Sequence, residues 1–394
     1  MWDLIEYLKQ PSLVAVIQNH FGIKDIIKSE KSNLEILKNN STNNTSIKEK
    51  KWDLNKPNNN DDYIIQNKFW YYLFLIGTNL GDEIFYASFI PFWFWNIDGA
   101  VGRRVVSVWT IVMYIGQGTK DIVKWPRPSY PAKRIQKKWA EEYGMPSTHA
   151  MIAVSIPFSV LIFTMNRYIY SFTFGILFSI TWCVIICISR VYFGMHTVLD
   201  IIVGIFFSIF LMIFMVPMVD YIDYYWLTSF YSPFVLLLTS ASATYFFPNS
   251  GHWTPTRGDT TMVTSVWAGI HIGAWTNFYV GNLTPYPHPP PYEIIWPNIY
   301  MLGLGLLRTI LGFTLVLATR NITKSFVVNV LSALLNTSAK NVTLKNYKKK
   351  TKEVFIELTT IYATYFLVGL NTVYSIPLIF RYLGIERPTF YTEI

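Results

Sequence analysis

The sequence has few charged residues and almost no cysteine. Only 14% of its 394 residues are charged, against about 25% in ordinary globular domains. So little charge cannot cover a water-facing surface, which argues against a soluble enzyme and indicates lipid as the main solvent. Cys183 and Cys187 lie four residues apart in an apolar run, a spacing that indicates packing on one helix face and neither a disulfide nor a metal site. The sequence predicts no metal and no cofactor.

The basic excess does not indicate a nucleic-acid partner. Lys and Arg outnumber Asp and Glu by 33 to 24, giving a formal net charge of +9. These cations lie in loops between apolar runs, as they do beside membrane helices. We therefore expect a bilayer as partner and no nucleic acid, while the sequence gives no sign of an oligomeric state.

Hydropathy divides the chain into four predicted regions. Residues 1–32 resemble an amphipathic segment, residues 33–68 a disordered Asn- and Lys-rich tether, residues 69–282 a membrane core and residues 283–394 further transmembrane helices. Apolar runs of about twenty residues can each cross a hydrocarbon layer of about 30 Å. The predicted fold is an all-α, polytopic transmembrane bundle of about nine spans, with eight to ten possible. The spans are 69–91, 105–121, 148–166, 170–189, 197–218, 230–247, 262–282, 299–319 and 356–380. The shorter run 326–337 is compatible with an interfacial segment or with one extra span.

Two ionisable clusters inside predicted spans need an explanation, because charge in lipid is costly. Asp82 and Glu83 lie in the first span and Arg308 lies in the eighth. Structural pairing, a misplaced span end and a functional site are all compatible with the sequence.

The first group of polar residues lies at the end of the second span. Lys120 and Arg127 are seven residues apart, about two helical turns, so both side chains can point to one side of the helix. An Arg fork and a Lys point charge together suit a phosphate. Cations also flank many membrane helices without any ligand, so this pair alone does not identify a phosphate site.

The second group lies immediately before the third span. Ser147 is placed to cap that helix, whose first amides lack partners and favour an anion. His149 would then lie in the first helical turn, beside a bound phosphate. A lone histidine near a helix start is more often a bystander, so the neighbouring groups must decide its role.

The third group joins the fourth and fifth spans. His196 and Asp200 are four residues apart and therefore neighbours on one helix face. Asp200 can accept a hydrogen bond from one imidazole nitrogen and leave the other free to act as a nucleophile. Arg190 adds another cation. A structural His–Asp pair at this spacing is the alternative.

Topology predicts that the three groups meet. The third and fourth spans are separated only by a short turn near 166–170 and therefore form a helical hairpin, which returns the chain to the side it left. The second and third groups then lie on one membrane face, and the first group enters the third span from the same face. This convergence is more specific than any single motif.

These motifs resemble the three signatures of the type 2 phosphatidic acid phosphatase superfamily. The matching positions are Lys120, Arg127 and Pro128, then Pro146, Ser147 and His149, then Ser189, Arg190, His196 and Asp200. The resemblance implies that His196 attacks phosphorus, that Asp200 orients His196, and that His149 acts as general acid and base. It also implies that the phosphoryl oxygens are held by Lys120, Arg127, Ser147, Arg190 and amides near Thr148.

Thr148 stands where the superfamily usually has glycine, and in this the chain is similar to the sphingosine-1-phosphate phosphatase branch. Further stretches that resemble this branch are 77–83, 91–93, 101–104, 113–117 and 256–260. The resemblance implies metal-free removal of phosphate from long-chain base phosphates at the endoplasmic reticulum membrane. The alternatives are a glucose-6-phosphatase-like or polyisoprenyl diphosphate phosphatase with the same motifs, or a membrane transporter without enzymatic activity.

Overall fold

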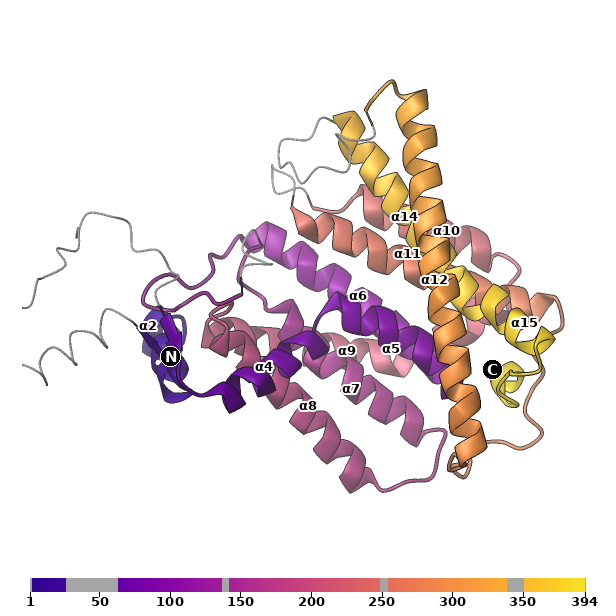
Figure 1. Ribbon diagram of the computed structural model, residues 1–394, viewed down its shortest axis with the longest axis horizontal. Coiled ribbons are helices and arrows are strands. Elements are labelled where there is room, and N and C mark those ends of the chain that lie inside the picture. The colour runs from indigo at the N-terminus through magenta and orange to yellow at the C-terminus, as the bar shows by residue number, and fades with distance from the viewer. Residues whose placement is uncertain (1, 26–62, 137–141, 249–253, 339–350, 394) are drawn as a thin grey trace, which may run out of the picture.

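The computed structural model describes residues 2–25, 63–136, 142–248, 254–338 and 351–393. Helices dominate these residues, as predicted, and form a bundle crossed on one side by a long helix (Figure 1). The helices from the second region onward are α4 Lys68–Leu80, α5 Glu83–Asn96, α6 Gly99–Val123, α7 Thr148–Met165, α8 Phe172–Tyr192, α9 Val198–Thr228, α10 Ser232–Tyr245, α11 Pro255–Tyr279, α12 Ile299–Leu334, α14 Thr351–Val373 and α15 Ser375–Tyr382, followed by a short 3-10 turn at Phe390–Thr392.

Polar side chains fix where several of these helices begin. The Asp98 carboxylate accepts a hydrogen bond from Val101 N at 3.0 Å at the start of α6. Asn298 accepts from Met301 N at 2.9 Å at the start of α12. Each cap satisfies an amide that has no partner inside the helix. The apolar runs thus form the helical interiors, and capping residues set their ends.

The prediction that residues 69–91 form a single helix is wrong. The chain breaks at Gly81 and Asp82, between α4 and α5. The Asp82 carboxylate accepts a hydrogen bond from Glu83 N at 2.7 Å and so caps α5. Asp82 and Glu83 therefore lie at a helix start, because a capping carboxylate favours a new helix over continuation.

In α12, two runs that were predicted to be separate form a single helix. The predicted span 299–319 and the shorter run 326–337 form one helix that extends to Leu334. No glycine or proline follows Gly312 within this helix, so nothing in the backbone chemistry interrupts it. Arg308 is buried within it.

The N-terminal region packs against the core. Helices α1 Trp2–Leu8 and α2 Pro11–His20 precede strand β1 Ile23–Asp25, which pairs antiparallel with β2 Tyr63–Ile65. The buried Gln18 amide donates to the carbonyl oxygens of Lys133 at 2.7 Å and Tyr192 at 2.9 Å. The predicted tether lies outside the described residues from 33 to 62, and its end at 63–65 forms the second strand.

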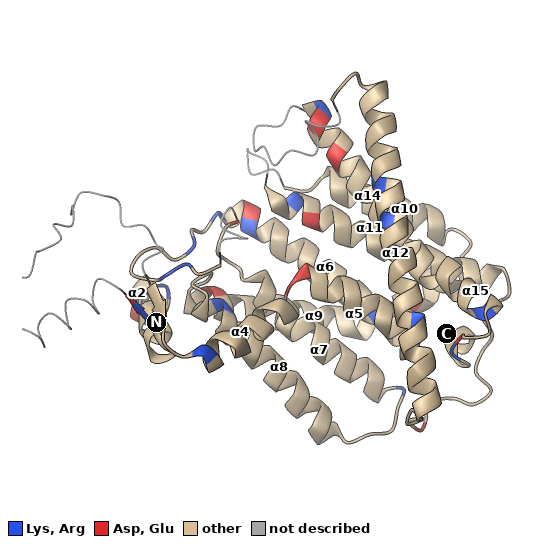
Figure 2. Cartoon of the chain, in the orientation of Figure 1, with Lys and Arg blue, Asp and Glu red and all other residues tan. Residues whose placement is uncertain are grey.

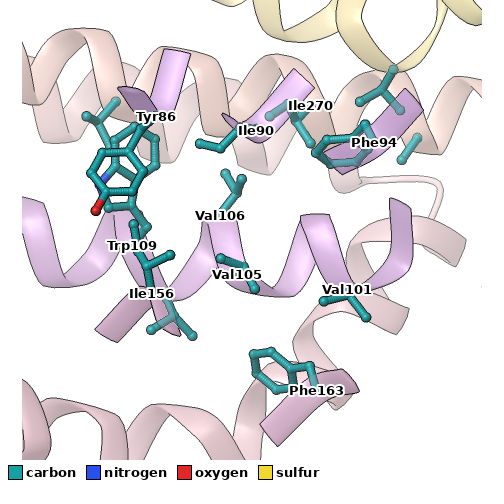
Figure 3. Close-up of a cluster of buried hydrophobic side chains, with 14 of the residues drawn as sticks. Tyr86, Ile90, Phe94, Val101, Val105, Val106, Trp109, Ile156, Phe163 and Ile270 are labelled. Carbon is teal, nitrogen blue, oxygen red and sulfur yellow. The ribbon is translucent and has the colours of Figure 1, made fainter. Parts of the chain in front are cut away.

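The core of the bundle surrounds α6, which packs against α7, α9 and α11. Apolar side chains of α5, α6, α7 and α11 point toward one another there (Figure 3). On the outer side, α14 packs against both α11 and α12. Trp95 ties α5 to this layer by donating to Thr372 O at 2.9 Å.

The apolar composition of the helices fits a membrane. Among the described residues, five helical stretches have the length and composition to cross a bilayer, namely Thr148–Met165, Phe172–Tyr192, Val198–Thr228, Ile299–Leu334 and Thr351–Tyr382. Charged residues are sparse along α7 and α8 and gather toward helix ends and loops (Figure 2). The chain is therefore a multi-pass membrane protein.

Cys183 and Cys187 are free thiols 3.9 Å apart, which agrees with helix packing.

Candidate active site

The end of α6 carries a fully buried lysine. Lys120 Nζ donates to Glu142 Oε2 at 2.9 Å and to Thr148 Oγ1 at 3.0 Å. The first contact reaches the loop before α7, and the second reaches the first residue of α7. Lys120 therefore links the first two sequence motifs directly.

Arg127 connects this loop to the third motif. Its Nε donates to the Glu142 carbonyl oxygen at 2.7 Å, and its Nη1 donates to Met195 O at 2.8 Å. Arg127 Nη1 also lies 3.4 Å from His196 Nε2. The guanidinium group thus stands beside the imidazole nitrogen that faces away from Asp200.

His196 lies in a tight turn between α8 and α9. Its Nδ1 is 3.7 Å from Asp200 Oδ2, and both side chains have no exposed surface. Gly194 has φ +66°, and a Cβ there would stand 2.1 Å from Lys133 O. Glycine is required at this position because both the backbone conformation and the close approach exclude a side chain.

Asp200 has two structural contacts in addition to His196. It forms a capping box with Thr197, in which Asp200 Oδ2 accepts from Thr197 N at 2.8 Å and Asp200 N donates to Thr197 Oγ1 at 3.2 Å. Its backbone oxygen accepts from Ser147 N at 3.2 Å. The starts of α7 and α9 are thereby joined at the site.

The second motif opens α7 as predicted. Ser147 caps the helix, with its hydroxyl 3.4 Å from Ala150 N. The His149 ring lies in the first turn against the α4–α5 break, where a Cβ on Gly81 would stand 3.0 Å from His149 Cδ2. The break that the sequence did not predict therefore forms one wall of the site.

Arg190 is fully buried at the end of α8. Its Nη1 donates to Thr78 Oγ1 and to Gln136 Oε1, the latter at 3.0 Å. Its Nε and Nη2 make no hydrogen bond within the described part of the chain. Buried donors without partners are costly, and here they suit an anionic ligand.

Burial is the main cause that lowers the pKa of His196 well below its usual value, and Arg127, Arg190, Lys120 and His149 lower it further. The imidazole is therefore neutral at physiological pH, as a nucleophile must be. Burial alone would raise the pKa of Glu142, but the Lys120 and Arg127 cations outweigh it and lower that pKa. Glu142 is therefore ionised.

All eight residues predicted from the sequence lie in this region. The structure adds Glu142, whose carboxylate contacts cations of the first motif. Its position seven residues before His149 gave no signal, because its partners come from distant segments. Among the described residues, no group of three or more His, Cys, Asp or Glu side chains could hold a metal ion.

Comparisons with known proteins identify the family. A family model described as the PAP2 superfamily matches residues 102–224, which include all three motifs. Human "Sphingosine-1-phosphate phosphatase 2" is 37% identical over 326 residues, covering 82% of this chain and 80% of the human protein. The chain belongs to the sphingosine-1-phosphate phosphatase family. Mouse "Sphingosine-1-phosphate phosphatase 1" is 36% identical over 318 residues, covering 80% of this chain and 73% of the mouse protein.

A more distant relative is also named as a lipid phosphate phosphatase. "Lipid phosphate phosphatase delta" of Arabidopsis thaliana is 26% identical over 293 residues, covering 68% of each chain. No solved structure matches the chain. Membership of the sphingosine-1-phosphate phosphatase family confirms the predicted resemblance and makes the protein a membrane phosphatase, which disfavours the transporter alternative.

Proposed function

We propose that the enzyme hydrolyses sphingosine-1-phosphate and related long-chain base phosphates in the endoplasmic reticulum membrane. The observation that carries this proposal is the buried His196 imidazole between Asp200 and Arg127, beside two further buried cations. The names of the relatives support the sphingoid substrate over a sugar phosphate or a polyisoprenyl diphosphate. Within this proposal, residues 69–282 form the catalytic core and residues 283–394 add membrane helices.

The proposed reaction has two steps. His196 Nε2 attacks phosphorus as the bond to the leaving alkoxide breaks, and His149 donates a proton to that alkoxide. His149 then takes a proton from water as the water attacks the phosphohistidine, which releases inorganic phosphate and regenerates His196. Asp200 orients His196 through Nδ1, whose distance to Oδ2 is 3.7 Å.

The phosphoryl group would be held by charge and by a helix start. Lys120, Arg127 and Arg190 are cations suited to the three phosphoryl oxygens, and their buried setting strengthens them as charge develops. Ser147 and the amide of Thr148 lie at the N-terminus of α7, where the helix dipole favours an anion.

The substrate assignment is tested by phosphate release from a panel of esters. Membranes that contain the full chain should prefer sphingosine-1-phosphate and dihydrosphingosine-1-phosphate over phosphatidate and glucose-6-phosphate. Equal activity on all lipid phosphates would agree with the proposed mechanism and contradict the preference for sphingoid substrates. Activity confined to glucose-6-phosphate would favour the alternative phosphatase.

Chelation of divalent metals is expected to leave turnover unchanged. The proposed steps use only histidine, carboxylate and cationic side chains, so no metal is needed to activate the nucleophile. Rates with sphingosine-1-phosphate would be measured in excess EDTA and again after Mg²⁺ is restored. A loss in EDTA that Mg²⁺ reverses would contradict the proposed mechanism.

A further inference from the structure

The carboxylate of Glu142 lies among the cations that the proposed function assigns to phosphate. Glu142 Oε2 is 2.9 Å from Lys120 Nζ and 3.6 Å from Arg127 Nη2. The side chains of all three residues are at most 4% exposed. A single carboxylate oxygen thus occupies the space between two phosphate-suited cations, as a phosphoryl oxygen would.

The charges at the site explain why an acid is present. Lys120, Arg127 and Arg190 bring three buried positive charges around His196. Asp200 compensates part of this charge, but its Oδ2 is engaged by Thr197 N and faces His196. Burial of several cations without counter-ions would cost several kcal/mol each. Glu142 therefore supplies the buried negative charge that directly contacts Lys120 and Arg127 when no phosphate is bound.

Two features hold the acid at this position. The Glu142 backbone oxygen accepts from Arg127 Nε at 2.7 Å, which fixes the main chain. Two residues later, a Cβ on Gly144 would stand 3.0 Å from Pro126 O and 3.3 Å from Asp200 Oδ2, so the loop lies close against the site. The main chain is fixed by these contacts, whereas the contacts of the carboxylate within the described residues are those to Lys120 and Arg127.

We propose that Glu142 is an internal counter-ion that occupies the phosphate position of the empty enzyme and is displaced by the substrate phosphate. This inference rests on the proposed function, because it assumes that Lys120 and Arg127 bind phosphate. It assigns a further role: Glu142 competes with substrate and with product for the same cations. After hydrolysis, the return of its carboxylate to Lys120 and Arg127 assists the release of inorganic phosphate.

The decisive measurement is the affinity of the full chain in detergent for inorganic phosphate. Glu142→Gln keeps the shape of the side chain and removes its charge. Phosphate then no longer competes with a carboxylate for Lys120 and Arg127. We expect the dissociation constant of radiolabelled phosphate to fall about tenfold or more, since one charge-assisted contact is lost from the competing state. The KM for sphingosine-1-phosphate should fall with it, and kcat should fall because phosphate leaves more slowly.

Two further variants make the outcome unambiguous. Glu142→Asp keeps the charge on a shorter side chain, so phosphate should bind it more weakly than it binds Glu142→Gln. Glu386→Gln removes a carboxylate that pairs with Arg381 on the surface and should leave phosphate affinity unchanged. Weaker or unchanged phosphate binding in Glu142→Gln would overturn the proposal and assign Glu142 to holding Lys120 and Arg127 in place.

If Glu142→Gln does not fold, the order of affinities between the parent and Glu142→Asp decides. Tighter binding by Glu142→Asp than by the parent supports displacement, because its carboxylate reaches the cations less well, and weaker or equal binding overturns it. The measurement uses inorganic phosphate and no lipid. A failure of the sphingoid assignment would therefore appear in the ester panel and not here.

Discussion

His196→Ala is expected to lower phosphate release from sphingosine-1-phosphate by at least about a thousandfold, as is typical when a nucleophile is removed. The imidazole lies between the carboxylate of Asp200, 3.7 Å from Nδ1, and the cation of Arg127, 3.4 Å from Nε2. The measurement is steady-state phosphate release from membranes with equal amounts of each protein.

A trapping experiment separates a lost nucleophile from a damaged site. Brief mixing with ³²P-labelled substrate should label the parent on histidine, as an acid-labile and alkali-stable adduct, and leave His196→Ala unlabelled. The matched control is His288→Ala, which changes an exposed histidine outside the bundle core and should keep both turnover and label. Parent-level turnover in His196→Ala would remove His196 from the proposed role.

The second large effect is expected from Gly269→Val in α11. A Cβ at this position would stand 2.1 Å from Phe366 O in α14, and a Cβ on Gly369 of α14 would stand 2.4 Å from Val266 O in α11. The two backbones therefore touch, with Gly269 and Gly273 four residues apart on the contact face, the small-residue spacing common between membrane helices. A valine must push the helices apart, at an expected cost of more than about 3 kcal/mol.

Thermal unfolding in detergent, followed by loss of monodisperse protein, measures this cost. Gly269→Val should unfold at a clearly lower temperature than the parent or fail to accumulate in membranes. The control is Gly303→Ala in α12, where a Cβ meets nothing within 4 Å and the unfolding temperature should not fall. An unchanged unfolding temperature in Gly269→Val would mean that α11 and α14 do not approach as described.

The sequence predicted the helical class, and it singled out the candidate site residues, because both depend on local patterns. Apolar runs of bilayer length mark helices whatever their partners, and the short turn after Met165 requires α7 and α8 to return the chain to the same face. The lone motifs were ambiguous. Their convergence followed from this topology, and in the structure Lys120 and Arg127 both contact Glu142 in one loop while Lys120 also contacts Thr148.

The errors arose where one local signal competed with another. The apolar residues around Gly81 and Asp82 outweighed the capping signal, so the break before α5 was missed. In α12 the polar residues between 319 and 326 separate two apolar runs, although nothing there interrupts a helix. Glu142 could not be found at all, because its role depends on Lys120 and Arg127, which the sequence alone does not place beside it.

The bond between Ser147 N and Asp200 O has a mechanical consequence. At 3.2 Å it joins the first residues of α7 and α9, and a Cβ on Gly204 would stand 2.7 Å from Ser147 O, so the two backbones are also in contact. His149 and His196, the proposed proton donor and nucleophile, therefore lie next to helix starts that are in direct backbone contact, so a hinge between α7 and α9 is not expected. Amide hydrogens at this contact should therefore exchange only when the whole bundle opens.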